Sequence, residues 1–133
     1  MRICRAFFCN LIRRQTNFDE YYSNPYICGF HKYINMLTHH VLFWLRPDTT
    51  EEEKHAFKKG LESLAAVETI KSIYIGTPAP ISRPVVDTTY TFSLLTTFED
   101  LAGHDVYQVH PVHKAFLDQF RSFFEKVVIY DAH

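Results

Sequence analysis

The stretch Tyr107-Gln108-Val109-His110-Pro111-Val112-His113 separates two helical patterns near the end of this 133-residue chain. Proline fixes φ, lacks an N–H and disfavours helical geometry in the residue before it. We therefore expect His110 to end one element and Pro111 to begin the next helix. A tyrosine and two histidines stand close together here, so the stretch also carries groups able to move protons near neutral pH.

The two histidines of this stretch have two open interpretations. His110 and His113 could bond only to backbone at a helix start, which is a purely structural role. Alternatively, Tyr107 and the two histidines could together serve as base, acid and hydrogen-bond donor, provided that the fold brings their side chains to one pocket. The sequence contains no measure of their separation, so it leaves both interpretations open.

The residues after Pro111 predict a helix from Val112 to about Glu125 and a last strand from Lys126 to Tyr130. Phenylalanines recur in this helix at the spacing of a buried stripe. They are Phe116, Phe120, Phe123 and Phe124. The residues before the stretch, Glu99 to Val109, predict a short helix with His104 on its solvent side.

Three more strands and one more helix are predicted upstream. Alternating apolar residues predict strands over Thr38–Leu45, Thr69–Gly76 and Thr88–Phe98. The acidic run after Thr50 predicts a helix to about Ala65 that begins with a Thr50/Glu53 capping box. The proline-rich segment 77–86 is expected to be a loop that covers a site or a subunit contact.

Adjacent histidines in the first strand should point to opposite faces of the sheet. His40 shares its face with Leu42 and Trp44, whereas His39 falls with Val41 and Phe43. A histidine among large apolar groups is either a buried core residue or part of a pocket lining. For His40 both interpretations stay open.

The element order β-α-β-β-α-β predicts an α+β, ferredoxin-like fold with a four-stranded antiparallel sheet and both main helices on one face. The other face of such a sheet carries large side chains and needs a cover. A second copy packed sheet against sheet would provide it and close a barrel-like homodimer. Homodimerisation is thus the main inference about partners.

Composition limits the remaining possibilities. At 133 residues the chain is long enough for one domain, and a net charge of −1 gives no reason to expect nucleic acid or a membrane as partner. Residues 1–35 hold all three cysteines, too few and too irregular for a disulfide framework or a zinc site. We expect 1–35 to be an N-terminal extension outside the core fold and 36–133 to form the domain. No credible targeting signal appears, which favours the cytoplasm.

Residues 36–133 resemble the stress-responsive dimeric α/β barrel (Dabb) domain family. The likeness rests on the strand that begins at His40, on the third strand ending Thr97-Phe98-Glu99, on the Tyr107–His113 stretch and on the ending Arg121 to Asp131. The order and spacing of these segments agree with the family over the whole region. The resemblance implies the dimeric ferredoxin-like fold described above.

The resemblance also implies roles for individual residues. One enzymatic member closes a linear polyketide by an aldol condensation without metal or cofactor, and its acid/base pair corresponds to Tyr107 and His113. His110 matches a supporting position, and His40 a strand histidine at the border of that enzyme's pocket. Phe92 stands where the enzyme has a histidine, and Trp44 is a further candidate pocket residue. The substitution at Phe92 leaves the substrate open.

Three functions therefore compete. The first is a small cofactor-free enzyme in which His113 takes the proton next to a carbonyl and Tyr107 holds the developing enolate. The second is a non-enzymatic protein that binds a small apolar ligand among its aromatic side chains. A metal site built from His40, His110 and His113 is disfavoured, because no carboxylate has ligand-like spacing to them.

Overall fold

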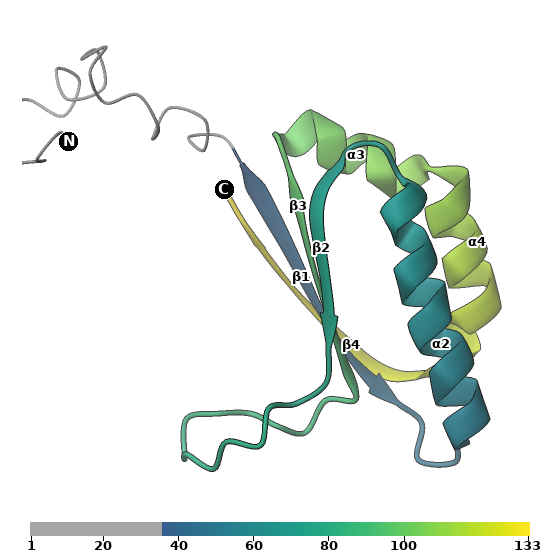
Figure 1. The fold of residues 1–133 in the computed structure, drawn as a ribbon, viewed down its shortest axis with the longest axis vertical. Coiled ribbons are helices and arrows are strands. Elements are labelled where there is room, and N and C mark those ends of the chain that lie inside the picture. Colours follow the sequence, from purple (N-terminus) through teal and green to yellow (C-terminus); the bar gives the residue numbers. More distant parts are fainter. Residues whose placement is uncertain (1–35) are drawn as a thin grey trace, which may run out of the picture. The chain divides into compact units, whose positions relative to one another are not determined.

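The computed structural model describes residues 36–133, so the predicted N-terminal extension lies outside the described residues. In chain order its elements are β1 (Leu37–Leu45), α2 (Glu51–Ser63), β2 (Ile70–Gly76), β3 (Phe92–Phe98), α3 (Leu101–Val109), α4 (Pro111–Phe120) and β4 (Phe124–Ala132). Short 3-10 turns follow α2 (Leu64–Ala66) and α4 (Arg121–Phe123). The strands form one sheet in the order β2-β3-β1-β4, and every neighbouring pair is antiparallel. The helices cover one face of this sheet (Figure 1), which confirms the predicted α+β ferredoxin-like fold.

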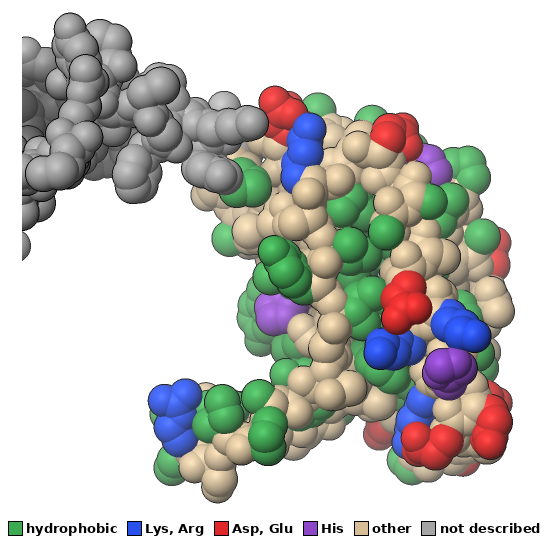
Figure 2. Space-filling model, in the orientation of Figure 1, with side chains coloured by type: hydrophobic (Ala, Val, Ile, Leu, Met, Phe, Trp, Pro, Cys, Tyr) green, Lys and Arg blue, Asp and Glu red, His purple; other side chains and the backbone are tan. Residues whose placement is uncertain are grey.

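Helix α2 begins at the predicted capping box. The Thr50 N–H donates to the Glu53 carboxylate at 2.8 Å, and the Glu53 N–H donates to the Thr50 hydroxyl at 3.2 Å. Two of the backbone donors at the helix start are thereby satisfied. Charged side chains gather over α2 (Figure 2), where Lys54 pairs with Glu51 at 2.7 Å and Lys58 with Glu62 at 4.0 Å. These charged residues form the solvated face of the helix.

The hydrophobic core lies between the sheet and the helices. Phe57 and Leu61 of α2 have no exposed surface, and they meet buried residues of β1, β3 and α4. Alternation along β1 is regular, with every odd-numbered residue from Leu37 to Leu45 buried. Because successive strand residues point to opposite faces, the core side of β1 carries His39, whereas His40 lies on the open side.

The C-terminal boundary between helix and strand differs from the prediction. Helix α4 ends at Phe120 rather than near Glu125, and β4 already begins at Phe124. Phe124 pairs with Leu45 of β1, after a register shift next to Trp44. Helical spacing of the phenylalanines was thus a misleading signal, because strand pairing with β1 takes the last of them into the sheet.

The connection between β2 and β3 is longer than predicted. Strand β3 starts at Phe92 rather than Thr88, so the irregular segment spans residues 77–91. The Asp87 side chain accepts hydrogen bonds from the Thr89 N–H and hydroxyl, and this local turn competes with strand pairing. The segment extends from the end of the sheet on the side away from the helices (Figure 1). It therefore projects on the side of the open face and does not cover the core.

Gly60 of α2 allows close helix packing, which leads to a first prediction. A Cβ atom at this position would lie 2.3 Å from a ring carbon of Phe120, a buried residue held by neighbouring rings. We expect Gly60→Ala to lower the free energy of unfolding by about 1–3 kcal/mol through overpacking. Helix propensity alone would raise it by about 1 kcal/mol. Urea denaturation decides between them, and a stabilised variant would contradict the described packing.

Candidate functional site

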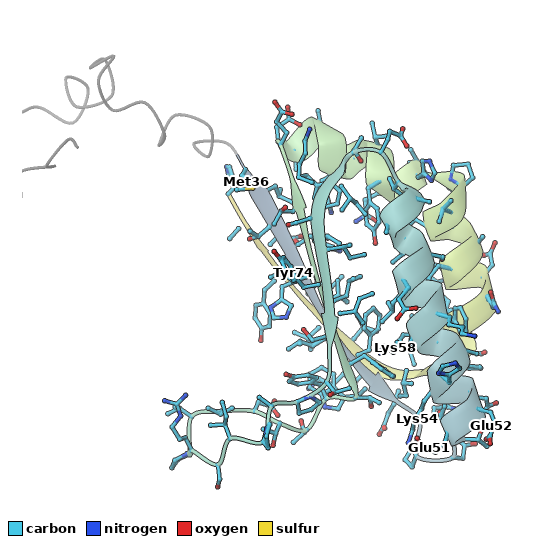
Figure 3. All side chains as sticks on the ribbon, viewed as in Figure 1. Met36, Glu51, Glu52, Lys54, Lys58 and Tyr74 are labelled. Carbon is cyan, nitrogen blue, oxygen red and sulfur yellow. The ribbon has the colours of Figure 1, made fainter. Side chains whose placement is uncertain are left out.

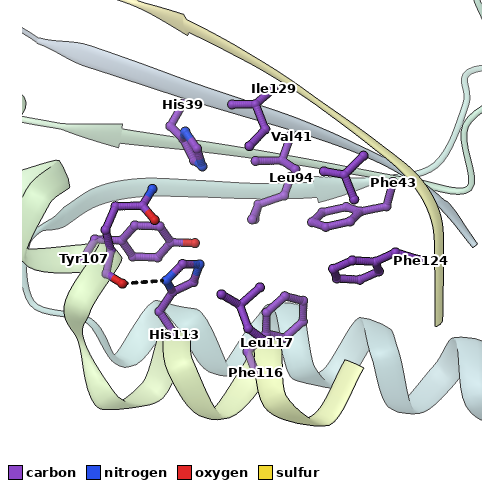
Figure 4. Close-up of a pocket in the computed structure, with 12 residues that line it drawn as sticks. His39, Val41, Phe43, Leu94, Tyr107, His113, Phe116, Leu117, Phe124 and Ile129 are labelled. Carbon is purple, nitrogen blue, oxygen red and sulfur yellow. Dashed lines mark hydrogen bonds between the residues drawn. The ribbon is translucent and has the colours of Figure 1, made fainter. Parts of the chain in front are cut away.

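A cavity of about 150 Å³ opens between the sheet and the helices α3 and α4. Most of its lining is apolar and comes from β1, β3, β4 and α4. Its polar side chains are His39, Tyr107, Gln108 and His113, and Figure 4 shows the labelled ones at the same end of the cavity. On the β4 side the lining residue Ile129 is 51% exposed, so this side of the cavity borders solvent. The cavity combines an apolar body with one polar end.

Tyr107 and His113 lie side by side at the polar end. Their ring centroids are 4.3 Å apart, and both side chains are buried. Tyr107 is the seventh residue of α3, and His113 falls in the first turn of α4. The turn at Pro111 between the two helices brings them together, although five residues separate them in sequence. The structure thus brings together the two residues that the family resemblance implies as a pair.

His113 has a defined arrangement of its ring nitrogens. Its Nδ1 lies 3.2 Å from the Gln108 carbonyl oxygen (Figure 4), and a carbonyl only accepts, so this nitrogen carries the proton. The other nitrogen, Nε2, then holds a free lone pair. Burial lowers the pKa of His113, although the hydrogen bond to Gln108 opposes this effect. A neutral imidazole with one free nitrogen is the form that a general base requires.

Tyr107 offers the complementary group, a hydroxyl that stays protonated. Burial raises the pKa of its phenol well above the usual range, because the phenolate would lose its hydration. No other side chain among residues 36–133 forms a hydrogen bond with this hydroxyl, which points into the cavity (Figure 4). Tyr107 is therefore available as a hydrogen-bond donor to a ligand oxygen.

His39 is the third titratable side chain of the cavity. Its side chain is 4% exposed, and its Nδ1 lies 2.6 Å from the Asp131 carboxylate. Because a carboxylate accepts, Nδ1 carries the proton and Nε2 is unprotonated in the neutral ring. The ring centroid lies 6.0 Å from that of Tyr107. The carboxylate holds His39 in one orientation next to the acid/base pair.

The other predicted site residues lie elsewhere. His110 caps α4, with its Nδ1 accepting from the Val112 N–H at 3.2 Å, and does not line the cavity. His40 and Trp44 lie on the open face of the sheet, where His40 contacts Ser93 at 2.8 Å. Phe92 faces the helices but packs against Phe57 rather than lining the cavity. The His40 and Trp44 pocket placement is therefore corrected: the strand histidine at the cavity is His39.

This difference has a physical cause. Both faces of β1 carry large apolar residues, and a shift of one residue exchanges the face that the helices cover. The expectation that His104 is an ordinary surface residue is also wrong, since only 9% of it is exposed. Gln108 and Asp131 were missed because their roles depend on contacts across the fold. For His39, the alternation that groups it with Val41 and Phe43 is the sequence signal that could have identified it as a cavity residue.

The lowered pKa of His113 predicts how stability responds to pH. The unfolded chain binds a proton at His113 near pH 6.5, while the folded protein binds it only at lower pH. The free energy of unfolding should therefore fall as the pH decreases from about 7 through this range. His39 and His104 also face His113 and oppose its charge. We expect His113→Leu to flatten the slope in urea denaturation at pH 5 to 8, and an unchanged slope would contradict it. The exposed His55→Leu on α2 is the control.

Comparison with known proteins places these features in a family. A family model described as the stress responsive A/B barrel domain matches residues 37–133. The chain belongs to this family. Olivetolic acid cyclase from Cannabis sativa is 30% identical to this chain over 94 residues, which cover 70% of this chain and 91% of the cyclase.

Solved structures with a similar fold agree with this family assignment. A dimeric protein of unknown function with a ferredoxin-like fold from Bacteroides fragilis is 26% identical, with a TM-score of 0.58, and the match covers 74% of this chain and 95% of that one. A hydroxynitrile lyase from Passiflora edulis has a TM-score of 0.63 at 18% identity, covering 74% and 92%. At that identity the lyase supports the fold alone.

Proposed function

We propose that this stress-responsive barrel domain is a small cofactor-free enzyme that performs acid/base chemistry on a carbonyl-bearing substrate. The observation that carries the proposal is the convergence of His113 and Tyr107 on one cavity. Its similarity to a cyclase at 30% identity adds support, because the match covers 91% of the cyclase. A polyketide-like chain is the substrate class that this similarity favours.

The roles of the two residues follow from their protonation states. His113 Nε2 takes the proton from the carbon next to a carbonyl, and the electrons move onto the carbonyl oxygen as an enolate. The Tyr107 hydroxyl donates a hydrogen bond to that oxygen, which stabilises the developing negative charge. Burial favours both states, because it keeps His113 neutral and Tyr107 protonated. Closure of a second bond by the enolate would complete an aldol condensation.

Cavity size limits the substrate. A volume of about 150 Å³ is close to that of an apolar protein cavity that holds one benzene molecule. A single ring, or a short chain folded to ring size, is therefore the part that reacts inside. Any longer tail has to leave the cavity, and the half-exposed Ile129 side offers the direction.

A non-enzymatic binding protein for a small apolar ligand is the second candidate. The apolar majority of the lining, which includes Val41, Phe43 and Leu94, favours it. Calorimetry and product analysis with single-ring methyl ketones, short linear polyketones and apolar rings without a carbonyl separate the two functions. An enzyme turns over at least one carbonyl compound, whereas a binding protein holds both ligand types unchanged. Binding of neither type would exclude both.

We also propose that two copies pack through the open face of the sheet. Apolar and aromatic residues crowd this face around His40, and Tyr74 is 64% exposed there (Figure 3). They include Leu42, Trp44, Leu95, Val128 and Tyr130. The segment 77–91 extends on the same side and carries Val85, which is 91% exposed, so a second copy would meet both. Relatives of this fold are described as dimeric.

The dimer leads to a prediction about molecular mass. A glutamate at Leu95 would be buried without a partner between the sheets, so Leu95→Glu should convert the dimer to a monomer. Light scattering measures the mass, and Ala56→Glu on the exposed side of α2 is the matched control. A wild-type protein with the mass of one chain would refute the dimer. A dimer retained by Leu95→Glu would refute this face.

The domain boundary and the location belong to the same proposal. Residues 36–133 form the folded domain, residues 1–35 lie outside its core, and the protein acts in the cytoplasm without nucleic acid or a membrane as partner. Within 36–133, no helix is both long and apolar enough to cross a bilayer. A chain starting at Met36 should keep the unfolding free energy of the full chain. A large loss would place the extension within the core.

A further inference from the structure

A second group of polar side chains lies behind the polar end of the cavity. His39 of β1, His104 of α3 and Asp131 of β4 each present one possible ligand atom, and these atoms all lie within 4.8 Å of one another. His39 and Asp131 touch at 2.6 Å, while the rings of His39 and His104 are 4.8 Å apart. Three elements distant in sequence therefore converge on one point.

His104 is the member of this group that has a buried polar atom without a hydrogen-bond partner. Its side chain is nine-tenths buried, and its Nδ1 has no hydrogen-bond partner. An unpaired polar atom in the interior costs free energy unless another group satisfies it. Its Nε2 lies 2.9 Å from the Gln108 amide nitrogen. With the amide turned over, the Gln108 oxygen accepts the proton of Nε2 and the lone pair of Nδ1 becomes free.

We propose that His39, His104 and Asp131 bind one divalent transition-metal cation of the Zn²⁺ class. Two imidazoles and one carboxylate are a ligand set that such ions prefer, and it leaves coordination positions open. Mg²⁺ and Ca²⁺ fit poorly, because they select oxygen ligands. The Gln108 amide would orient His104 in the way that outer hydrogen bonds orient metal-bound histidines.

The geometry requires modest movement. Ligand atoms about 2.1 Å from a tetrahedral ion lie about 3.4 Å apart, so the short His39–Asp131 contact has to open and the widest separation has to close by about 1.4 Å. Asp131 can move, because its side chain is 47% exposed. His39 would bind through Nδ1, which has to give up the proton that it donates to Asp131, and the neutral ring then carries its proton on Nε2.

The metal site goes beyond the proposed acid/base function. His39 lines the cavity, whereas His113 and Tyr107 are not among the ligands, so the acid/base pair does not depend on the ion. A bound cation would add positive charge beside the cavity and attract a carbonyl or carboxylate oxygen of the ligand. Metal binding and proton transfer can therefore fail separately.

Titration of the full chain with Co²⁺, followed by its visible absorption and by calorimetry, tests this site. Serine at Cys4, Cys9 and Cys28 removes competing thiolates from the protein used throughout. We expect one saturable equivalent, competed by Zn²⁺, and affinities at least roughly tenfold weaker in both His104→Leu and Asp131→Asn. His55→Leu, which removes an exposed histidine of α2, should bind like the parent protein.

The outcomes are decisive in both directions. Absence of a saturable site in the parent protein, or equal affinity in the parent and the Asp131→Asn variant, would overturn the proposal. Asp131 is half exposed, so this variant should fold even if His104→Leu does not, and circular dichroism checks both. Turnover lost in His113→Ala with Co²⁺ binding intact would leave the metal site standing independently of the catalytic pair.

Discussion

Replacement of His113 by alanine is expected to lower turnover of a carbonyl substrate by about 10²- to 10⁴-fold, the usual contribution of a positioned general base. The reason is the loss of the free Nε2 that the Gln108 hydrogen bond holds toward the cavity. Steady-state kinetics on the best substrate from the ketone panel measures the effect. Because the base acts in the transition state, most of the loss should appear in kcat rather than in KM.

Two further variants show whether the loss comes from chemistry. Tyr107→Phe keeps the ring that packs against His113 and removes only the hydroxyl, so it should fold normally and lose about 10²- to 10³-fold in kcat. His55→Ala, far along the chain on the exposed side of α2, should retain wild-type turnover. Equal turnover in wild type, His113→Ala and Tyr107→Phe would exclude the pair.

Replacement of Phe57 by alanine is expected to lower the free energy of unfolding by about 3–5 kcal/mol. Phe57 has no exposed surface and lies within 6.0 Å, between ring centroids, of five other phenylalanines that come from β1, β3, α4 and β4. Its removal leaves a cavity where both layers of the fold meet, and the rigid rings around it cannot collapse fully.

A matched variant sets the scale for this loss. Phe123→Ala also removes one phenyl ring, but Phe123 is only partly buried and packs mainly against Phe120. Urea denaturation should show a clearly smaller loss for Phe123→Ala, because less apolar surface returns to water. Equal losses in the two variants would contradict the central position of Phe57.

Most of the fold could be predicted from local pattern. The capping box at Thr50, the alternation in β1 and the break at Pro111 each act within a few residues, so their consequences are visible in sequence. Their order then restricted the topology to the ferredoxin-like plan. The predictions are wrong where pairing across the sheet outweighs local preference. Phe124, for example, has the spacing of a helical residue but pairs with Leu45 of β1.

The candidate site could be predicted only in part. Tyr107 and His113 are near each other in sequence, so one turn suffices to bring them together. His39 and Asp131 are 92 residues apart, and nothing local marks them as partners. The residue pattern of α3 predicts His104 on the solvent side, because it does not reveal that β1 and β3 cover this side.

Exchange of the methyl protons of acetophenone in D₂O tests the acid/base pair most directly. This ligand is a single ring with a methyl ketone, matched to a cavity of about 150 Å³, and exchange requires only removal of a proton next to the carbonyl. NMR follows the loss of the methyl signal with wild type, His113→Ala and Tyr107→Phe. The pair predicts exchange at least about 100-fold faster with wild type than with His113→Ala. Equal exchange rates in the three proteins, with acetophenone bound in each, would contradict it.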